Sequence, residues 1–308
     1  MPLKLILDCD PGLDDALALL LAHGDPNLEL VAVTTVGGNV ALTHTTRNAL
    51  QLREYLGFDD VPVAAGAAGP LTGPIVDASY VHGASGLGSV TLPEAVLGAS
   101  ETAAVDLIIS TLREAPGTVH LVATGPLTNI ALALRAEPRI AQWAASFIIM
   151  GGSYTRGNTT PAAEFNIYAD PEAAAEVFAA DWTVVMVGLD LTLQAIVHDG
   201  IVDRMHALGA LGTDLVAPLA TFWTNPLDDD WDGQALHDVC AVAYLGRPDL
   251  FEVKAARVDV ETRGEFTRGM TVVDFHSATP NAIVPTRLDV DGFWDYIHEA
   301  WAGVSIRG

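Results

Sequence analysis

Short apolar runs that alternate with longer Ala- and Leu-rich segments constrain the fold of this sequence most. The runs are four to seven residues long and rich in aliphatic and β-branched side chains, which is typical of strands buried on both faces. They cover residues 3–7, 30–36, 61–65, 119–123, 147–150 and 184–187. The helical segments between them cover residues 14–23, 43–56, 101–114, 127–135 and 171–179. Such alternation predicts an α/β fold with a mostly parallel sheet.

The C-terminal part follows a different pattern. Residues 254–261, 270–275 and 283–290 are predicted strands with no helical segment between them. We therefore expect an open, mostly parallel, Rossmann-like sheet flanked by helices, with a small antiparallel extension in the C-terminal part. No linker, low-complexity tract or repeat divides the chain, so one domain is predicted over residues 1–308. That length is close to the upper limit for a single core, roughly 250–300 residues.

The charge and hydropathy of the chain exclude several classes of protein. There are 15 Lys and Arg against 39 Asp and Glu, a net charge of −24, yet the mean hydropathy of +0.32 is too high for a disordered chain. The negative charge repels phosphate backbones and anionic lipid, so no nucleic-acid or membrane partner is expected. Two cysteines cannot form a disulfide framework, and the N-terminus does not resemble a signal peptide. We expect a cytoplasmic protein.

Four aspartates follow the first predicted strand within eight residues. Asp8 and Asp10 lie on the same side of the strand end, and Asp14 and Asp15 fall at the start of the next helix. Helix capping accounts for Asp14 and Asp15 but not for Asp8 and Asp10. Carboxylates this close repel one another unless a cation or a proton lies between them, and oxygen ligands select Ca²⁺ or Mg²⁺. The sequence therefore predicts a metal site at the carboxyl edge of the sheet, where ligands bind in open α/β sheets.

A haloacid-dehalogenase-type phosphatase is an alternative with a similar opening. Those enzymes also begin with a strand followed by Asp-x-Asp, but a Thr or Val normally stands where this chain has Gly12. Phosphoryl transfer would also need a Lys or Arg near the phosphate. The residues directly after the predicted strands include none. The phosphatase is the less favoured interpretation.

The acidic run Asp-Cys-Asp-Pro-Gly-Leu-Asp-Asp-Ala at residues 8–16 resembles the Asp-x-Asp-x-x-x-Asp-Asp motif of the inosine–uridine-preferring nucleoside hydrolases. Further blocks look like those of this family and stand in the expected order. They are residues 36–40, 82–88, 123–129, 150–152, 157–158, 163–166 with 170–174, and 237–238. The resemblance extends from residue 3 to beyond residue 240. One departure is Val239, where many relatives have a proline after the His-Asp pair.

The resemblance implies a hydrolase that uses one Ca²⁺ per subunit to cleave the N-glycosidic bond of ribonucleosides into free base and ribose. The metal ligands would be Asp10, Asp15, the main-chain carbonyl of Thr124 and Asp238, with Asp8 behind them. Asp14 would be the general base that takes a proton from a water held by the metal. His237 would be the acid that protonates the departing base. The ribose would contact Asp14, Asn39, Met150, Asn158, Glu164, Asn166 and Asp238, and the base would face His82, Phe165 and His237.

This assignment agrees with the chemistry. Glycosidic cleavage builds positive charge on the sugar ring, which carboxylates stabilise. A bound Ca²⁺ can hold two sugar hydroxyls and a water, and a separate carboxylate must then act as base. The lack of cationic residues in the loops after the strands favours an uncharged nucleoside over a nucleotide. A Ca²⁺-dependent nucleoside- or pentose-binding protein without catalysis is a further alternative, but the presence of Asp14 and His237 favours an enzyme.

Three further expectations concern the rest of the chain. The aromatic and acidic segment 221–231 is predicted to be a flap over the base, where the choice between purine and pyrimidine nucleosides would lie together with His82. Cys9 and Cys240 adjoin proposed ligands but are interpreted as small packed residues. The family resemblance implies a homodimer or homotetramer.

Overall fold

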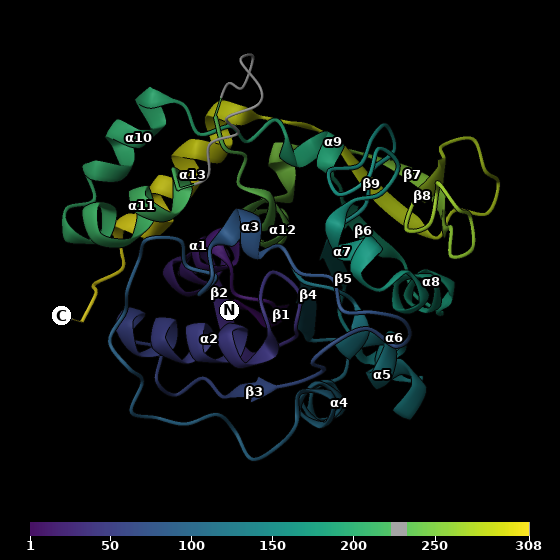
Figure 1. Ribbon diagram of the computed structural model, residues 1–308, viewed down its shortest axis with the longest axis horizontal. Coiled ribbons are helices and arrows are strands. Elements are labelled where there is room, and N and C mark those ends of the chain that lie inside the picture. Colours follow the sequence, from purple (N-terminus) through teal and green to yellow (C-terminus); the bar gives the residue numbers. More distant parts are fainter. Residues whose placement is uncertain (223–232, 308) are drawn as a thin grey trace.

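The computed structural model describes residues 1–222 and 233–307, in which nine strands form one sheet in the order β3-β2-β1-β4-β5-β6-β9-β7-β8 (Figure 1). The strands are β1 Leu3–Cys9, β2 Leu28–Thr35, β3 Val63–Ala65, β4 Val119–Ala123, β5 Phe147–Met150, β6 Val184–Val187, β7 Phe251–Val260, β8 Thr271–Asp274 and β9 Ala282–Leu288. Neighbours from β3 to β9 pair in parallel, and β7 pairs antiparallel with both β9 and β8. The predicted sheet and its antiparallel extension are confirmed.

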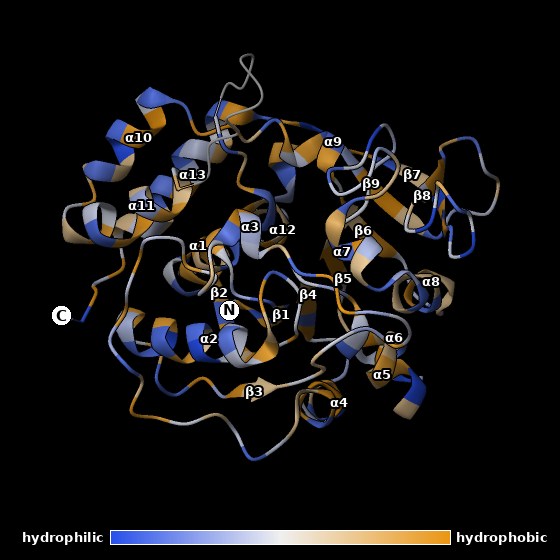
Figure 2. Cartoon of the chain, in the orientation of Figure 1, coloured by the Kyte–Doolittle hydropathy of each residue, from blue (hydrophilic) through white to orange (hydrophobic). Residues whose placement is uncertain are grey.

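Helices flank this sheet, and two apolar cores lie between the sheet and these helices. The helices are α1 Leu13–Gly24, α2 Leu42–Leu56, α3 Ser79–His82, α4 Ala104–Glu114, α5 Thr128–Ala136, α6 Ile140–Trp143, α7 Phe165–Ala169, α8 Pro171–Ala179, α9 Leu189–Thr192, α10 Asp199–His206, α11 Ala217–Ala220, α12 His237–Gly246 and α13 Val290–Ala302. Side chains of α1, α12 and α13 pack in one core, and those of α4, α5 and α8 pack in the other. Figure 2 shows hydrophilic positions concentrated on outer helices such as α2 and α10.

The most buried helix of the molecule is α1, which follows directly after β1. Ten of its residues are buried, from Leu13 to Ala22, and α12 and α13 both pack against it. A helix that is apolar around its whole circumference fits such a position in the core. Within the described ranges, no helix has the length and apolar character needed to cross a membrane.

The register of the central strands sets the position of the functional edge. Asp8 in β1 lies opposite Thr34 in β2 and Ala123 in β4, so the three strands end at the same level. The polar residues that follow each strand therefore meet at one edge, as expected for parallel strands. The turn from β1 into α1 occupies the middle of this edge.

Candidate active site

The β1–α1 turn is stabilised by hydrogen bonds from its main chain to the carboxylate of Asp15. Asp15 accepts hydrogen bonds from the main-chain N–H groups of Asp10 (3.2 Å) and Gly12 (3.1 Å), so the side chain folds back over the start of the helix. It also accepts the hydroxyl of Thr124 at 2.9 Å and the side-chain amide of Asn39 at 2.9 Å. Burial and the neighbouring charge of Asp14 raise the pKa of Asp15 to about 6.

Asp10 is completely buried, and only one of its two carboxylate oxygens has a hydrogen-bond partner among the described residues. Its Oδ2 accepts the main-chain N–H of Asn39 at 2.6 Å, whereas its Oδ1 has no hydrogen-bond partner among the described residues. The carboxylate fits because two neighbours lack side chains: a Cβ on Gly38 would lie 2.1 Å from its Oδ2, and a Cβ on Gly125 would lie 2.6 Å from its Oδ1. Burial and the charge of Asp15 raise the pKa of Asp10 well above its usual range. An unpartnered buried carboxylate oxygen suits a cation ligand.

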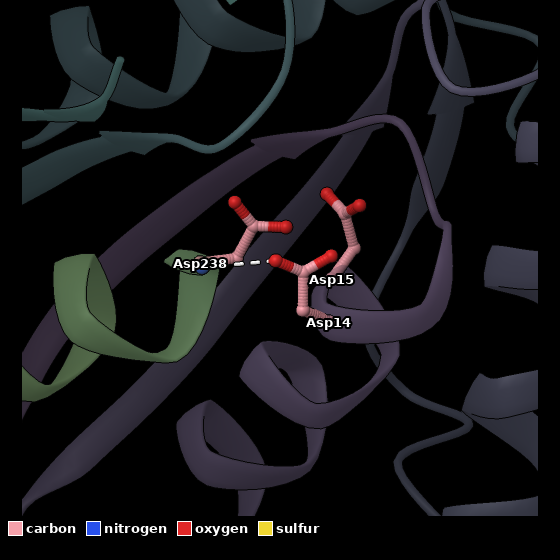
Figure 3. A group of neighbouring side chains, drawn as sticks. All are labelled: Asp14, Asp15 and Asp238. Atoms are coloured by element: carbon pink, nitrogen blue, oxygen red, sulfur yellow. Dashed lines mark hydrogen bonds between the residues drawn. The ribbon is translucent and has the colours of Figure 1, made fainter. Parts of the chain in front are cut away.

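Three aspartates meet closely enough to hold a metal ion between them. Asp14, Asp15 and Asp238 each offer one carboxylate oxygen, and these atoms lie within 4.8 Å of one another (Figure 3). Asp14 also accepts the main-chain N–H groups of His237 (3.2 Å) and Asp238 (3.4 Å), which joins the start of α1 to the start of α12. Burial, followed by the charges of Asp14 and Asp15, raises the pKa of Asp238 well above its usual range. The donors are all oxygen atoms, which suits a hard cation.

Asp8 lies one layer deeper than these groups and does not line the cavity described below. Its Oδ1 accepts the hydroxyl of Thr34 (2.6 Å) and the amide of Asn129 (2.8 Å), while its Oδ2 is buried without a partner in the described structure. Burial raises the pKa of Asp8 to about 7. This carboxylate is held by side chains from β2 and α5.

A cavity of about 350 Å³ opens above the carboxylates. Eleven of the fourteen site residues predicted from the sequence line it, whereas Asp8, Asp10 and Asp15 do not. The eleven are Asp14, Asn39, His82, Thr124, Met150, Asn158, Glu164, Phe165, Asn166, His237 and Asp238. They come from strand ends, loops and helices that are far apart in the sequence, and the fold brings them together.

One wall of the cavity is formed by the loop after β5 and by α7. Its polar side chains also make hydrogen bonds to main-chain groups. Glu164 caps α7, because its carboxylate accepts the N–H groups of Asn166 (2.9 Å) and Ile167 (3.1 Å), and it accepts the N–H of Gly152 as well. Burial raises the pKa of Glu164 to about 7. The amide of Asn166 donates to the main-chain carbonyl of Thr124 at 2.7 Å. These side chains are therefore fixed before any ligand binds.

Two histidines also line the cavity. His82 accepts the main-chain N–H of Leu13 at Nδ1 (3.0 Å), so in the neutral ring the hydrogen is on Nε2. His237 shares a 2.7 Å hydrogen bond between its Nδ1 and the hydroxyl of Thr192. Burial lowers the pKa of both rings, and the charge of Asp14 opposes that shift in each.

Arg156 and Tyr80 also line the cavity, although the sequence analysis named neither of them. Arg156 lies on the loop after β5, beyond the three residues that were considered for that strand end. Its guanidinium has no ion pair or hydrogen bond to the described residues, whereas eleven other arginines in the same part of the chain pair with a carboxylate. The sequence feature that could have identified Arg156 is its proximity to Asn158, which was predicted to contact the ribose.

Most of the predicted flap at 221–231 lies outside the described residues. Phe222, at its start, lies against Gly88, where a Cβ would come within 2.6 Å of the Phe222 ring. Cys9 and Cys240 are buried and free, and burial raises the pKa of both thiols. They are packed residues, as the sequence indicated.

Comparison with known proteins places this chain in a family. A family model described as inosine-uridine preferring nucleoside hydrolase matches residues 5–295. The pyrimidine-specific ribonucleoside hydrolase RihA of Citrobacter koseri is 44% identical over 308 residues, covering 98% of this chain and 99% of the relative. The inosine-uridine preferring nucleoside hydrolase of Leishmania major is 44% identical over 306 residues, covering 97% of this chain and 98% of the relative.

Solved structures agree with the sequence relatives. The purine-preferring ribonucleoside hydrolase from Gardnerella vaginalis has a TM-score of 0.91 and 32% identity, and covers 97% of this chain and 98% of its own. A plant nucleoside hydrolase has a TM-score of 0.89 and 32% identity, and covers 98% of this chain and 99% of its own. These matches give no support to the phosphatase alternative. The chain belongs to the inosine-uridine preferring nucleoside hydrolase family and is a ribonucleoside hydrolase.

Proposed function

We propose that this enzyme hydrolyses the N-glycosidic bond of inosine, uridine and cytidine in a Ca²⁺-dependent reaction. The observation that carries the proposal is the group of buried carboxylates beneath the cavity, Asp10, Asp14, Asp15 and Asp238. In the described part of the chain none of them forms an ion pair with a Lys or Arg, although twelve such ion pairs form elsewhere. Uncompensated buried charge is costly, and four carboxylates so close together favour a bound cation that neutralises them.

The proposed Ca²⁺ ligands, one ion per subunit, are Asp10, Asp15, the main-chain carbonyl of Thr124 and Asp238. The unpartnered Oδ1 of Asp10 and the purely oxygen donor set support this choice. When bound, Ca²⁺ would hold sugar hydroxyls and a water at the cavity floor and make that water more acidic.

Asp14 is the proposed general base. Its Oδ2 accepts two main-chain N–H groups at the start of α12, which fixes the orientation of the carboxylate. No donor in the described structure contacts its Oδ1, so this oxygen is available to accept a proton from the attacking water. Its charge also faces the ring on which positive charge develops in the oxocarbenium-like transition state.

The proposed sugar contacts are Met150, Asn158, Glu164 and Asn166, which line one wall of the cavity. The base would lie between His82, Phe165 and His237. Because Nδ1 of His237 is engaged with Thr192, its Nε2 would deliver a proton to the departing base. A protonated base is a better leaving group than an anionic one.

Release of reducing sugar from each nucleoside tests the proposal. The protein is first freed of metal with a chelator and then assayed with and without added Ca²⁺. We expect turnover that depends on Ca²⁺, and loss of at least about 100-fold in kcat for Asp10→Asn and Asp14→Asn. Asp181→Asn, which alters an exposed aspartate outside the cavity, is the matched control. Unchanged turnover in Asp10→Asn and Asp14→Asn would refute the assigned roles.

We further propose that the enzyme is a homodimer or homotetramer, which rests on the family resemblance. A cytoplasmic location is proposed as well, and it rests on the two free, buried cysteines. Light scattering on the purified protein measures its molar mass and so tests the oligomeric state. A monomer at micromolar concentration would contradict it.

A further inference from the structure

Asn39 connects the two sides of the β1–α1 turn by three hydrogen bonds. It follows β2 and is buried. Its main-chain N–H donates to Oδ2 of Asp10 at 2.6 Å, and its side-chain amide donates to the main-chain carbonyl of Asp10 at 3.1 Å and to Oδ2 of Asp15 at 2.9 Å. One residue therefore contacts both carboxylates that are proposed to bind the cation from this turn.

The amide of Asn39 can have only one orientation here. Both of its side-chain partners are oxygen acceptors, so Nδ2 must face them, and its two hydrogens are both used. Only Oδ1 remains for the cavity. The family resemblance assigns this residue to the ribose hydroxyls, yet most of its hydrogen-bonding capacity is directed at Asp10 and Asp15.

The carboxylates need such a partner because they repel each other. Asp10 and Asp15 are buried side by side, no Lys or Arg of the described residues pairs with either, and each could rotate away from the other. The main-chain N–H of Asn39 holds Oδ2 of Asp10, while its side-chain amide holds Oδ2 of Asp15 and the main-chain carbonyl of Asp10. Oδ1 of Asp10 is left unpartnered among the described residues, in the position where Gly38 and Gly125 make room for it. Residues that orient ligands in this way commonly change metal affinity by about 10–100-fold.

We propose that Asn39 is a positioning residue for the cation: it fixes Asp10 and Asp15 as ligands, and it affects the nucleoside mainly through the metal. This inference rests on the proposed Ca²⁺-dependent function. It differs from a ribose-contact role in a measurable way, because a ribose contact would change KM without changing the affinity for Ca²⁺.

Asn48 provides a matched control for the experiment. It is a buried asparagine in α2 whose amide also makes two hydrogen bonds, to the main-chain carbonyls of Pro11 (2.9 Å) and Ser85 (2.7 Å). It supports the same turn but contacts no carboxylate. Asn39→Ala and Asn48→Ala therefore remove equal numbers of side-chain hydrogen bonds from neighbouring places.

The test measures Ca²⁺ affinity by calorimetry, thermal unfolding in chelator, and kcat and KM for uridine over a range of Ca²⁺ concentrations. We expect Asn39→Ala to weaken Ca²⁺ binding by about 10–100-fold, with most of the loss in kcat/KM recovered at high Ca²⁺. We expect Asn48→Ala to lower the unfolding temperature but to change Ca²⁺ affinity less than threefold. Asn39→Ser, which keeps one donor, should bind Ca²⁺ with intermediate affinity and serves if the alanine variant does not fold.

A different result would overturn the inference. If Asn39→Ala and Asn39→Ser bind Ca²⁺ as tightly as the unaltered protein while KM rises at every Ca²⁺ concentration, Asn39 is a ribose contact. If the unaltered protein binds no Ca²⁺, both the inference and the proposed metal site are wrong. The two failures are thus distinguished by the unaltered protein alone.

Discussion

Replacement of Asp8 by asparagine in the metal-free protein removes a buried negative charge but keeps the shape of the side chain. Burial raises the pKa of Asp8 from 3.8 to about 7, so above pH 7 the folded protein must hold an ionised group that prefers water. A shift of about three units corresponds to roughly 4 kcal/mol, since one unit is about 1.4 kcal/mol. The neutral amide of the Asp8→Asn variant would avoid this cost.

The substitution also has an opposing effect. The oxygen of the new side chain can still accept from Thr34 and Asn129, but its amide nitrogen would occupy the place of Oδ2, which has no partner among the described residues. An unsatisfied buried donor costs about 1–3 kcal/mol. The net expectation at pH 8 is therefore a free energy of unfolding about 1–3 kcal/mol higher for Asp8→Asn than for the unaltered protein.

The difference in the free energy of unfolding between Asp8→Asn and the unaltered protein changes sign with pH. Because the folded-state pKa is raised, the favourable contribution of protonated Asp8 is complete below pH 3.8 and is lost as the pH rises through about 7. The advantage of the Asp8→Asn variant should thus shrink as the pH falls from 8 to 5, and only the unsatisfied amide should remain at the acid end. Urea unfolding in chelator at several pH values, with Asp181→Asn as control, measures this. Parallel pH profiles for Asp8→Asn and the unaltered protein would refute the reasoning.

Three other changes test the site. Gly125→Ala places a Cβ 2.6 Å from Oδ1 of Asp10, so calorimetry should show at least tenfold weaker Ca²⁺ binding while circular dichroism shows a retained fold. His237→Ala should lower kcat for inosine about 100-fold or more, but much less for a nitrophenyl riboside, whose leaving group needs no proton; equal losses in steady-state assays would contradict the acid role. Arg156→Ala should raise KM for uridine about threefold to tenfold, because its guanidinium lines the cavity without a partner among the described residues; an unchanged KM would exclude a substrate contact.

The fold followed from local patterns to a large extent, because buried parallel strands and amphipathic helices have characteristic lengths and compositions. Strands β4, β5 and β6 were predicted with the bounds that they have. The short helices α9 and α11, of four residues each, were not predicted, since segments so short carry no periodic signal. They form because tertiary packing covers them.

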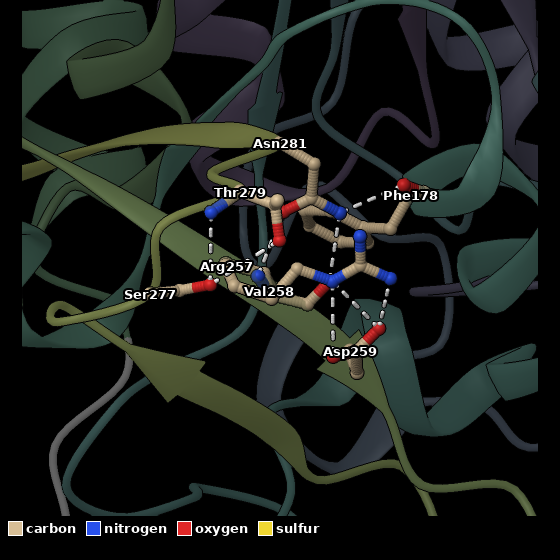
Figure 4. A network of polar contacts seen from close by, with 7 residues as sticks. All are labelled: Phe178, Arg257, Val258, Asp259, Ser277, Thr279 and Asn281. Carbon is tan, nitrogen blue, oxygen red and sulfur yellow. Dashed lines mark hydrogen bonds and ion pairs between the residues drawn. The ribbon is translucent and has the colours of Figure 1, made fainter.

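The pairing of the C-terminal strands depends on contacts that no local pattern contains. Asn281 accepts the N–H of Val258 at 2.8 Å and donates to the carbonyls of Val258 (2.9 Å) and Phe178 (2.8 Å), which joins β7, the start of β9 and α8 (Figure 4). An asparagine before a strand could equally be part of a turn. The sequence therefore predicted the extension but not how it is attached.

The residues that we propose as metal ligands came from the acidic run and from the family resemblance, but their mutual orientation could not be predicted. Neither the unpartnered oxygen of Asp10 nor the commitment of Asn39 to Asp10 and Asp15 can be inferred from spacing, because both depend on the side chains that surround them. Arg156 was missed for the same reason: its place on the cavity wall depends on the path of the loop after β5.

The hydrogen bonds from α12 to Asp14 also bear on when activity can arise during synthesis. Asp14 is made among the first residues, whereas the N–H groups that orient it belong to His237 and Asp238, 223 and 224 positions later. A nascent chain can build β1 and α1 early but cannot complete the site until α12 has left the ribosome. Prematurely terminated chains that end before residue 237 would lack both the orienting groups and one carboxylate. We therefore expect translation products that end before residue 237 to be inactive.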